Sequence, residues 1–482
     1  MNLRLTGNFL GKILLLECAA MVPSLILSIC ETNWSSVTAF LITMAALSAF
    51  GGMLSLIKAK KQKLYAREGF VIVALSWIFI SLFGALPYTI SGYVPSYVDS
   101  LFETVSGFTT TGSSILSDIE ALPMGLLLWL SITIWLGGMG VLVFILALAP
   151  RGNGSGMNLH IMKAESPGPV VGKIAPKLHS TARILYSMYI ALTILEFIFL
   201  ICGGMPLFDS VNTALSTAGT GGFSIRNAGI AAYSAYSQVV IAIFMMLFGV
   251  NFSIYYLLLI RDFRSIWKNG EVKVYFSIVI IATAVIAFST ASLFSNAGET
   301  IRHSFFQVNA IITTTGFSTV DFNMWPVFSQ TILVGLMFIG GCAGSTAGGL
   351  KVTRVIILLK SFKNEVRRML HPQCVTTVKV DGKPIDDGTV NQVGIYFAIY
   401  IFIMILSVLV LSIAGHSFTT NVTSVISCLN NIGPGLDEVG PVCNYGFFPA
   451  YGKVVLIVDM LLGRLELFPL LMLFSPSVWK RI

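Results

Sequence analysis

The sequence predicts an all-α integral membrane fold: four helix–pore-loop–helix repeats around a pseudo-fourfold central pore, preceded by two extra transmembrane helices. Three observations predict it: an apolar composition, ten long hydrophobic runs, and a short Thr/Gly phrase that recurs four times. Of the 482 residues, 55% are hydrophobic and 11% are charged. A soluble protein of this size could not place so much apolar surface in water, so we expect its solvent to be lipid.

The hydrophobic runs give the number of membrane crossings. A helix needs about 20 apolar residues to cross roughly 30 Å of hydrocarbon. Runs near this length occur at 13–30, 37–57, 70–90, 124–149, 183–203, 236–260, 274–295, 327–350, 390–414 and 454–475. We expect the two N-terminal transmembrane helices within residues 1–66. The four repeats would then occupy 67–160, 161–268, 269–375 and 376–482.

Basic residues in the links between the runs predict the orientation. They gather after the second, fourth, sixth and eighth runs, as Lys58, Lys60, Lys61, Lys63, Arg67, Arg151, Lys163, Lys173, Lys177, Arg261, Arg264, Lys268, Lys360, Lys363, Arg367 and Arg368. Such links favour the cytoplasmic side of a membrane. An even number of crossings then places both termini in the cytoplasm. The alternate links, such as 91–123 with its acidic residues and no Lys or Arg, would be external.

Other classes of function lack support in the sequence. The net charge of +8 does not indicate nucleic acid, because no basic patch with interleaved aromatic residues occurs. The seven cysteines form no C-x-x-C pair, so neither a disulfide framework nor a zinc site is indicated. The five histidines share no spacing that would build a catalytic site. We therefore expect no enzyme, no catalytic residues and no cofactor.

Four related phrases mark an internal repeat. They are Phe108-Thr-Thr-Thr-Gly-Ser113, Ala218-Gly-Thr-Gly-Gly-Phe-Ser224, Ile312-Thr-Thr-Thr-Gly-Phe-Ser318 and Leu429-Asn-Asn-Ile-Gly-Pro434, aligned on Gly112, Gly222, Gly316 and Gly433. They recur roughly every hundred residues. Each follows a short apolar segment that opens near a Phe, namely Phe102, Phe208, Phe305 and Phe418. We expect each unit to be helix, short re-entrant helix, glycine loop and helix.

A glycine loop at membrane depth can hold a bare cation. Backbone carbonyl oxygens replace the hydration water of the ion when several loops aim them at one axis. Glycine permits the backbone conformations and close approaches that a Cβ would forbid. The C-terminal end of each short helix would also direct its negative dipole end at the ion. Four such loops predict a cation-selective pore, whereas ordinary surface turns would not recur at equivalent places on one side.

Glycines interrupt the eighth run, at 340–350. The residues concerned are Gly340, Gly341, Gly344, Ser345, Thr346, Gly348 and Gly349, followed by Lys351. So many glycines cannot make a steady helix. Unwound backbone survives at membrane depth only when it packs in protein or lines a water-filled cavity, so we expect an intramembrane gating loop below the filter. Close helix packing through small residues stays open as the alternative. A phosphate-binding loop is not satisfied here.

Two further features bear on gating. Residues 351–370 predict a basic helix leaving the membrane, which would either couple a cytosolic regulator to the gate or lie on the membrane surface. Arg464 falls near the middle of the last run, where a charge is costly and should face the bundle interior or water. It would be either a pore charge that opposes permeating cations or the partner of Asp459 or Glu466 in a structural ion pair.

The chain resembles the Trk/Ktr/HKT superfamily of potassium transporters, and within it the Trk-type membrane subunit. Besides the four phrases, the resemblance rests on Arg67-Glu-Gly-Phe70, Trp135-Leu-Gly-Gly-Met-Gly140, the stretch 339–351, the stretch 429–436 and Leu462-Gly-Arg-Leu-Glu466. The two extra N-terminal spans also look like the Trk type. The likeness runs essentially the full length.

The resemblance implies potassium uptake across the cytoplasmic (inner) membrane of a prokaryote, with potassium as the transported ligand. It also implies a homodimer, gated by the intramembrane loop and by a separate cytosolic nucleotide-binding regulatory ring (TrkA-like). Carried over by position, the potassium-binding filter residues are Thr110, Thr111, Gly112, Thr220, Gly221, Gly222, Thr314, Thr315, Gly316, Asn431, Ile432 and Gly433. In the second loop, Gly219 competes with Gly222 for the register.

The resemblance leaves the cargo and the mode of transport open. None of the four loops matches the T-V-G-Y-G of tetrameric potassium channels. A sodium-permeable or sodium-coupled transporter of the same architecture is therefore the alternative, and channel-like and coupled transport are both possible readings. An integral-membrane enzyme is the distant alternative.

Overall fold

The computed structural model describes residues 3–57, 66–140, 178–374, 376–381 and 383–479, and its regular structure there is almost entirely helical. The exception is one hairpin of β1 (Lys379–Val380) and β2 (Lys383–Pro384), paired antiparallel. The predicted all-α fold class is thus confirmed. Residues 141–149 of the fourth run and the predicted topology signals Lys58, Lys60, Lys61, Lys63, Arg151, Lys163, Lys173 and Lys177 lie outside the described residues.

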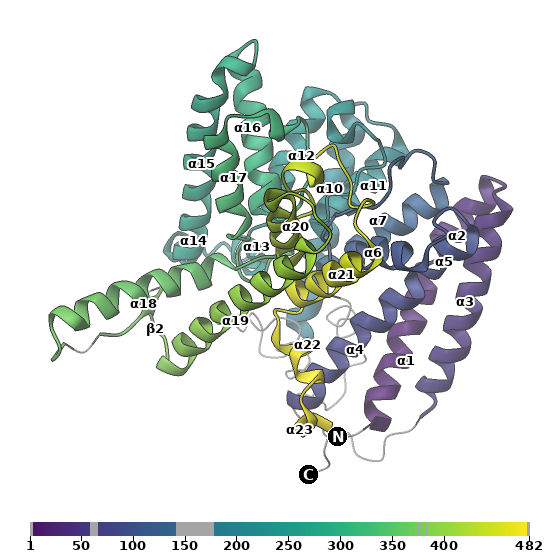
Figure 1. Cartoon of the computed structure of the whole chain (residues 1–482), viewed down its shortest axis with the longest axis horizontal. Coiled ribbons are helices and arrows are strands. Elements are labelled where there is room, and N and C mark those ends of the chain that lie inside the picture. Colours follow the sequence, from purple (N-terminus) through teal and green to yellow (C-terminus); the bar gives the residue numbers. More distant parts are fainter. Residues whose placement is uncertain (1–2, 58–65, 141–177, 375, 382, 480–482) are drawn as a thin grey trace.

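Three N-terminal helices precede the repeats: α1 (Leu3–Ala20), α2 (Val22–Cys30) and α3 (Trp34–Ser55). Small residues let α1 and α3 approach closely, because a Cβ on Gly11 would lie 2.5 Å from the backbone nitrogen of Ser55 and 2.6 Å from the carbonyl oxygen of Gly51. Packing through glycine is a common way for helices to associate in lipid, where no hydrophobic effect drives them together. This pair stands at one edge of the bundle (Figure 1).

The remaining helices are described in four groups, in chain order. The first group is α4 (Ala66–Gly84), α5 (Leu86–Ser91), α6 (Tyr97–Phe108) and α7 (Met124–Gly138). The second is α10 (Leu178–Cys202), α11 (Leu207–Gly219), η1 (Gly229–Ala232), α12 (Ala235–Phe248), α13 (Phe252–Leu259) and α14 (Phe263–Lys268). The third is α15 (Gly270–Thr290), η2 (Ala291–Leu293), α16 (Ala297–Ile312), η3 (Phe322–Met324), α17 (Val327–Met337) and α18 (Val352–Leu370). The fourth is α19 (Asp387–Ser412), α20 (Phe418–Asn430), η4 (Asp437–Val439), α21 (Ala450–Arg464), α22 (Phe468–Leu473) and α23 (Pro476–Trp479).

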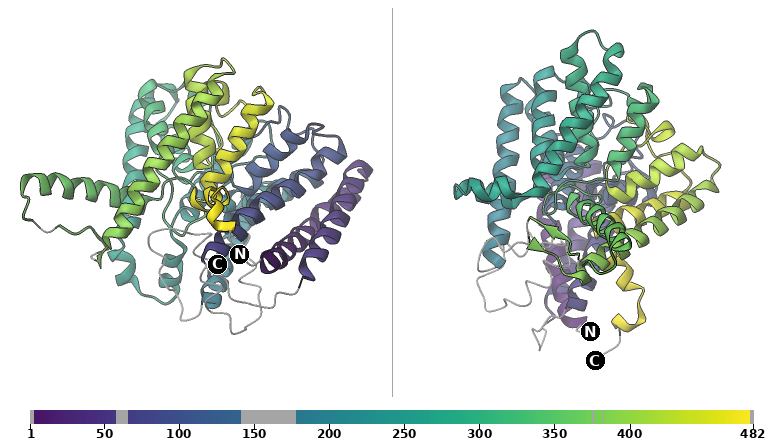
Figure 2. Two further views of the ribbon diagram at one scale, coloured as in Figure 1. Left: turned by 60° about the horizontal axis from the view of Figure 1, so that its bottom comes forward. Right: turned by 90° about the vertical axis from the view of Figure 1, so that its left-hand side faces the viewer.

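Within the described ranges, six segments are long and apolar enough to cross a membrane without a sharp bend, and each matches a predicted run. They are Leu3–Cys30, Trp34–Ser55, Arg67–Ser91, Ala182–Cys202, Gly270–Leu293 and Asp387–Ser412. The start of α1 and the end of α23 lie on the same side of the bundle, while α18 projects from it (Figures 1 and 2). The predicted helix at 351–370 is therefore confirmed as α18.

The second helix of each repeat is shorter or broken, which the sequence predicted only in part. The interruption of 327–350 is confirmed, because α17 has 11 residues and an irregular stretch follows. The continuous span at 236–260 is wrong: α12 and α13 meet at 92°, with Asn251 capping α13 through the backbone N–H of Ser253. The continuous span at 454–475 is also wrong, because Glu466 and Leu467 have φ of 52° and 66° and end α21. α7 ends at Gly138 after 15 residues.

Four short helices stand at equivalent places in the repeats: α6, α11, α16 and α20, which we call the pore helices. Each packs against the second helix of the preceding repeat: α11 on α7, α16 on α12, α20 on α17 and α6 on α21. The last of these contacts joins the fourth repeat to the first, so the packing closes into a ring. Pseudo-fourfold symmetry requires this cyclic order, and it brings the C-terminal ends of the pore helices together.

The predicted starts of the pore helices were right in two repeats and late in two. α11 and α20 begin within one residue of Phe208 and Phe418. α6 begins earlier than predicted because the Ser96 side chain caps it by accepting from the backbone N–H of Asp99. Asn296 caps α16 in the same way, through the N–H of Glu299. N-cap residues fix where a helix begins more strongly than the next apolar residue does.

Candidate functional site

Every pore helix ends in the same backbone turn. The residue two positions before the aligned glycine has a positive φ in each repeat: Thr110 57°, Thr220 56°, Thr314 55° and Asn431 55°. The next N–H then bonds to a carbonyl five residues back, as from Thr111 to Ser106 at 2.8 Å and from Ile432 to Ser427 at 2.9 Å. This is the Schellman ending of a helix. A non-glycine residue in this conformation costs about 1–3 kcal/mol, and such strain gathers at functional sites.

The aligned glycines allow each loop to lie in close contact with the next one. Their φ values are 81°, 66°, 79° and 105° for Gly112, Gly222, Gly316 and Gly433. A Cβ added to each would lie too close to a carbonyl oxygen of the following loop: 2.1 Å for Gly112 to Gly221, 1.8 Å for Gly222 to Thr315, 1.9 Å for Gly316 to Ile432 and 2.8 Å for Gly433 to Thr111. The fourth contact returns to the first loop. The four loops therefore form one closed ring.

The shared geometry bears on the register of the second loop. Gly222 has the positive φ and the neighbour contact of the other aligned glycines, whereas Gly219 is the last residue of α11. This backbone geometry favours Gly222 over Gly219 as the counterpart of Gly112, Gly316 and Gly433. All twelve predicted filter residues lie in the ring, at the ends of the four pore helices.

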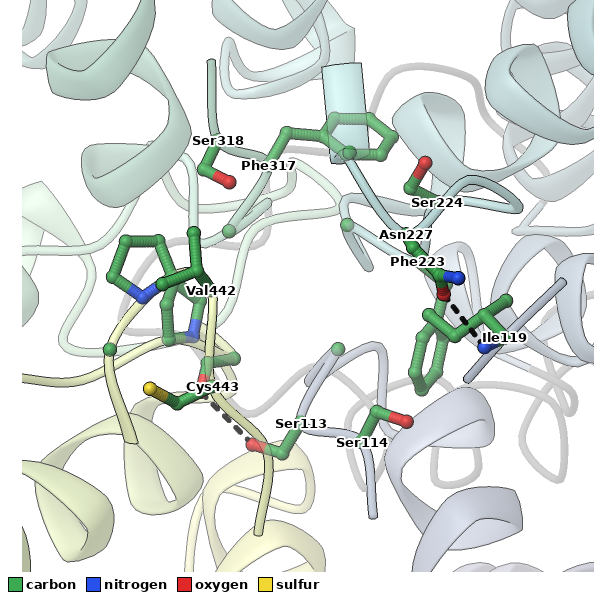
Figure 3. Close-up of a pocket in the computed structure, with 18 of the residues that line it drawn as sticks. Ser113, Ser114, Ile119, Phe223, Ser224, Asn227, Phe317, Ser318, Val442 and Cys443 are labelled. Carbon is green, nitrogen blue, oxygen red and sulfur yellow. Dashed lines mark hydrogen bonds between the residues drawn. The ribbon is translucent and has the colours of Figure 1, made fainter. Parts of the chain in front are cut away.

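A cavity opens on one side of the ring, which we call the mouth side. Its wall includes the residues directly after the aligned glycines: Ser113, Phe223, Phe317 and Pro434. Figure 3 shows the four loops around a single opening, with the first and third on opposite sides of it. The ring is therefore reachable from the mouth side, as an ion pathway requires.

Polar groups link the rim of the cavity across repeats. The N–H of Ile119 donates to Asn227 at 2.9 Å (Figure 3), and the Asn227 amide donates to Asp118 at 2.7 Å. Arg226, which also lines the cavity, pairs with Asp209 at 3.2 Å. The Asp209 carboxylate raises the pKa of the Arg226 guanidinium, which stays charged, and the pair is locally neutral. Entering cations therefore do not meet an unpaired positive charge from Arg226 at the rim.

Hydroxyl and amide groups brace the ring. The hydroxyl oxygens of Thr109 and Thr111 lie 2.8 Å apart, and those of Thr313 and Thr315 lie 2.7 Å apart. The Asn431 amide donates to Thr111 Oγ1 at 2.9 Å and so joins the fourth loop to the first. These bonds satisfy polar groups that lipid could not, and they fix the positions of the loops.

The predicted gating loop lies between α17 and α18. It is closed at its base by a bridge between Ile339 and Leu350, with the N–H of Gly340 donating to the Leu350 carbonyl at 2.8 Å. Its backbone reaches the ring directly, because the N–H of Gly348 donates to Thr314 Oγ1 at 2.6 Å. The second helices begin near the mouth and run away from it, so the loop lies on the far side of the ring from the cavity.

Several predicted gating residues have defined contacts. Ser345 donates to the Cys342 carbonyl at 2.7 Å, and the Gly344 carbonyl accepts from the N–H of Phe252 at 3.0 Å. Lys351 is buried and donates to the Ala347 carbonyl within the loop. A Cβ on Gly340 would lie 2.1 Å from the Gly348 carbonyl oxygen. Gly341, Thr346 and Gly349 belong to the same packed turn.

Arg464, the last residue of α21, joins the ring to the gating loop. Its guanidinium donates to Thr110 Oγ1 at 3.2 Å and to the Thr346 carbonyl at 3.0 Å. It also donates to the carbonyls of Gly137 and Gly138, the latter at 2.6 Å, at the C-terminal end of α7. The negative end of a helix dipole favours a cation at this place.

The two carboxylates offered by the sequence as partners for Arg464 are engaged elsewhere. Asp459 accepts from Ser407 at 2.8 Å, and Glu466 forms a buried ion pair with Arg354. The Arg354 guanidinium also lies 4.2 Å from the centre of the Tyr396 ring. Arg464 thus lies beside the ring of loops, and the buried ion pair of Glu466 is with Arg354.

The sequence prediction missed Glu271, which bonds the 340–350 loop at Ala343 and the start of α18 at Thr353. Its Oε1 accepts from the N–H of Ala343 at 2.7 Å, from the N–H of Thr353 at 3.2 Å and from the Thr353 hydroxyl. The available signal was an acidic residue at the start of an apolar run, where an ionisable residue needs partners.

The comparisons with known proteins agree with this geometry. The profile of the TrkH family, described as cation transport protein, matches residues 36–481. The chain is 35% identical to the Trk system potassium uptake protein TrkH of Escherichia coli K12 over 100% of both chains, and 30% identical to TrkG of the same strain over 99% of both. The crystal structure of the potassium transporter TrkH from Vibrio parahaemolyticus covers 100% of both chains at a TM-score of 0.89 and 30% identity.

The fold, the helix order and the identity all extend over the full chain. The predicted fold class and the predicted resemblance are therefore confirmed, and the chain is a multi-pass transport protein and not an enzyme. The chain belongs to the TrkH family of cation transport proteins.

Proposed function

We propose that this chain takes up potassium across the membrane through the ring of four loops. One observation carries the proposal: four pore helices end at one place in the same turn, and each aligned glycine abuts a carbonyl of the next loop. The relatives that match over the full chain are named potassium uptake proteins. Potassium is thus the proposed transported ligand, and it needs no cofactor in this chain.

The filter would act by replacing the hydration shell of the ion. The twelve ring residues would supply backbone carbonyls around the opening, and carbonyl oxygens are the ligands that dehydrate potassium in selective pores. The four pore helices direct their negative dipole ends to the same place, which favours a cation over an anion. Glycine at positions 112, 222, 316 and 433 permits the close approach of the loops that a narrow ring requires.

The gating loop and Arg464 would close the pathway on the far side of the ring. The loop contacts the third filter loop through Gly348, and the Arg464 charge lies beside the first through Thr110. A fixed positive charge at this depth opposes a permeating cation. Opening then requires that the 340–350 loop shift and that Arg464 release Thr346. Small-residue packing alone would not explain a backbone that is bonded to the filter.

The remaining parts of the proposal concern orientation and partners. Positive residues in the links favour a cytoplasmic location for both termini in the inner membrane. We also propose a homodimer and a cytosolic TrkA-like nucleotide-binding ring that acts on the gate. α18 supports this coupling, since it begins at the gating loop and projects out of the bundle (Figure 2).

Uptake of rubidium by cells that lack their own potassium systems tests the filter. We expect Gly316→Ser to abolish uptake, because its Cβ would lie 1.9 Å from the Ile432 carbonyl oxygen at a φ of 79°. Gly335→Ser is the matched control, since a Cβ on Gly335 meets nothing within 4 Å. Normal uptake by Gly316→Ser would sink the filter assignment.

Sodium is the second candidate cargo, because the ring is not chemically fourfold. The residue before the aligned glycine is Thr111, Gly221, Thr315 or Ile432 in the four repeats. Competition between sodium and rubidium in the same uptake assay separates the two cargoes.

A further inference from the structure

The carbonyl of one filter glycine is fully engaged by side chains. The Gly433 oxygen accepts from the Tyr445 hydroxyl at 2.7 Å, from the Ser427 hydroxyl at 2.7 Å and from the Ser113 hydroxyl at 3.1 Å. We call Tyr445, Ser427 and Ser113 the hydroxyl trio. A carbonyl oxygen has two lone pairs, so three donors leave none for another ligand.

The other three aligned glycines differ in this respect. No residue in the described part of the chain donates a hydrogen bond to the carbonyls of Gly112, Gly222 or Gly316. Gly433 also has the largest φ of the four, 105° against 66° to 81°, and precedes a proline. The fourth loop therefore presents its outer carbonyl differently from the other three.

One position in the pore helices explains part of the difference. The residue six positions before the aligned glycine is Ser106, Ser216, Ala310 or Ser427 in the four repeats. The hydroxyls of Ser106 and Ser216 are buried and have no partner among the described residues, and alanine has no hydroxyl. Only the Ser427 hydroxyl reaches the filter glycine of its own loop.

Long-range contacts hold the other two members in place. The backbone N–H of Tyr445 donates to the Ser114 carbonyl at 2.8 Å, and its ring packs at 5.7 Å from that of Phe102. Ser113 points from the first loop toward the fourth, and its bond is drawn in Figure 3. The trio thus joins the first and fourth repeats beside the ring.

We propose that the hydroxyl trio withdraws the Gly433 carbonyl from the ion, so that the outermost level of the filter offers three free carbonyls instead of four. The trio is then a specificity determinant. Discrimination between potassium and sodium depends on how many carbonyls face the ion and on their field strength. Three hydroxyl donors neutralise the negative end of the Gly433 carbonyl dipole and hold it in place. This inference rests on the proposed filter function.

The test is the permeability ratio of sodium to potassium, measured as a reversal potential in liposomes that contain the full chain. Tyr445→Phe and Ser427→Ala each remove one donor and leave the side-chain volume nearly unchanged. A single variant still leaves two donors for the two lone pairs, so we expect the double variant to lower the sodium-to-potassium ratio by about two- to tenfold, the range that one hydrogen bond is worth. Each single variant should lower the ratio by less than the double variant does. Ser216→Ala is the matched control, because its hydroxyl has no partner in the described structure, and it should keep the wild-type ratio.

The outcomes separate this inference from the filter itself. A ratio that is unchanged or higher in the Tyr445→Phe/Ser427→Ala double variant would overturn the inference, even where Gly316→Ser abolishes flux and the filter stands. Normal flux through Gly316→Ser would instead refute the filter. If the variant with Tyr445→Phe does not fold, as judged by thermal unfolding, the Ser113→Ala/Ser427→Ala double variant decides the question by the same criterion.

Discussion

Removing the charge of Arg464 should increase cation flux. The Arg464→Ala change deletes a guanidinium that bonds the first filter loop at Thr110, the gating loop at Thr346 and the end of α7 at Gly138. Two effects then act in the same direction. The repulsion of a permeating cation is lost, and the gating loop loses a bond that holds it to the filter.

The size of the electrostatic effect can be worked from the contact to Thr110. The guanidinium nitrogen lies 3.2 Å from Thr110 Oγ1. An ion in contact with the same loop would lie about 6 Å from the charge, one hydrogen bond plus one ion–oxygen contact away. The repulsion at that separation is about 2.8 kcal/mol for an effective dielectric constant near 20, and about 0.7 kcal/mol in bulk water. These values correspond to increases in flux of about 100-fold and about threefold.

The assay is rubidium uptake into liposomes that contain purified protein. Arg464→Lys is the control, because lysine keeps the charge but cannot bond several carbonyls with a planar fork. Arg464→Ala should exceed the wild-type rate by at least about threefold, with Arg464→Lys closer to wild type. Equal or lower flux through a folded Arg464→Ala protein would refute the reasoning and make Arg464 a structural residue.

Two further predictions concern the gating loop and its exit helix. Glu271→Gln weakens an acceptor that binds Ala343 and Thr353, so we expect greater basal flux in the liposome assay, while Glu365→Gln, an exposed control, should leave flux unchanged. Unchanged flux in Glu271→Gln would remove Glu271 from the gate. Arg354→Ala leaves Glu466 buried without its ion-pair partner, which should lower the free energy of unfolding by about 3–5 kcal/mol. Thermal unfolding in detergent checks this, and an unshifted midpoint would show that the pair contributes nothing to stability.

Local sequence signals predicted the repeated features of the fold well. The pore helices, the glycine loops and the interruption of 327–350 each depend on residues close together in the chain. Thr and Gly at 108–113 and 312–318 have unusual backbone requirements, and those requirements show in the sequence directly. The same holds for the crossings, since a membrane span needs only a long apolar run.

The breaks in the second helices could not be predicted in the same way. Residues 236–260 are apolar almost throughout, and the 92° bend occurs where Gly249 packs against Tyr275 and Thr313, which are distant in sequence. Likewise, Arg464 bonds mainly backbone carbonyls, which any residue carries. The sequence therefore offered the nearby carboxylates of Asp459 and Glu466 as partners of Arg464. In the structure, these carboxylates bond to Ser407 and Arg354 instead.

The filter asymmetry also escaped prediction because its parts are far apart in sequence. Ser113 and Gly433 belong to different repeats, and Tyr445 lies in the link that follows the fourth loop. The alignment on the glycines shows four similar phrases, whereas the hydrogen bonds show that one carbonyl is unlike the others. The four similar phrases thus predicted the ring of loops, but they did not predict the hydrogen bonds that engage the Gly433 carbonyl.

Direct location of bound ions tests the central claim that the four loops form a cation filter. Crystals grown in rubidium should give anomalous peaks on the axis of the ring, beside the carbonyls of Thr111, Gly221, Thr315 and Ile432. Crystals of the Gly316→Ser variant should lose or weaken those peaks. Rubidium found only away from the ring, with wild-type protein that transports rubidium, would contradict the account.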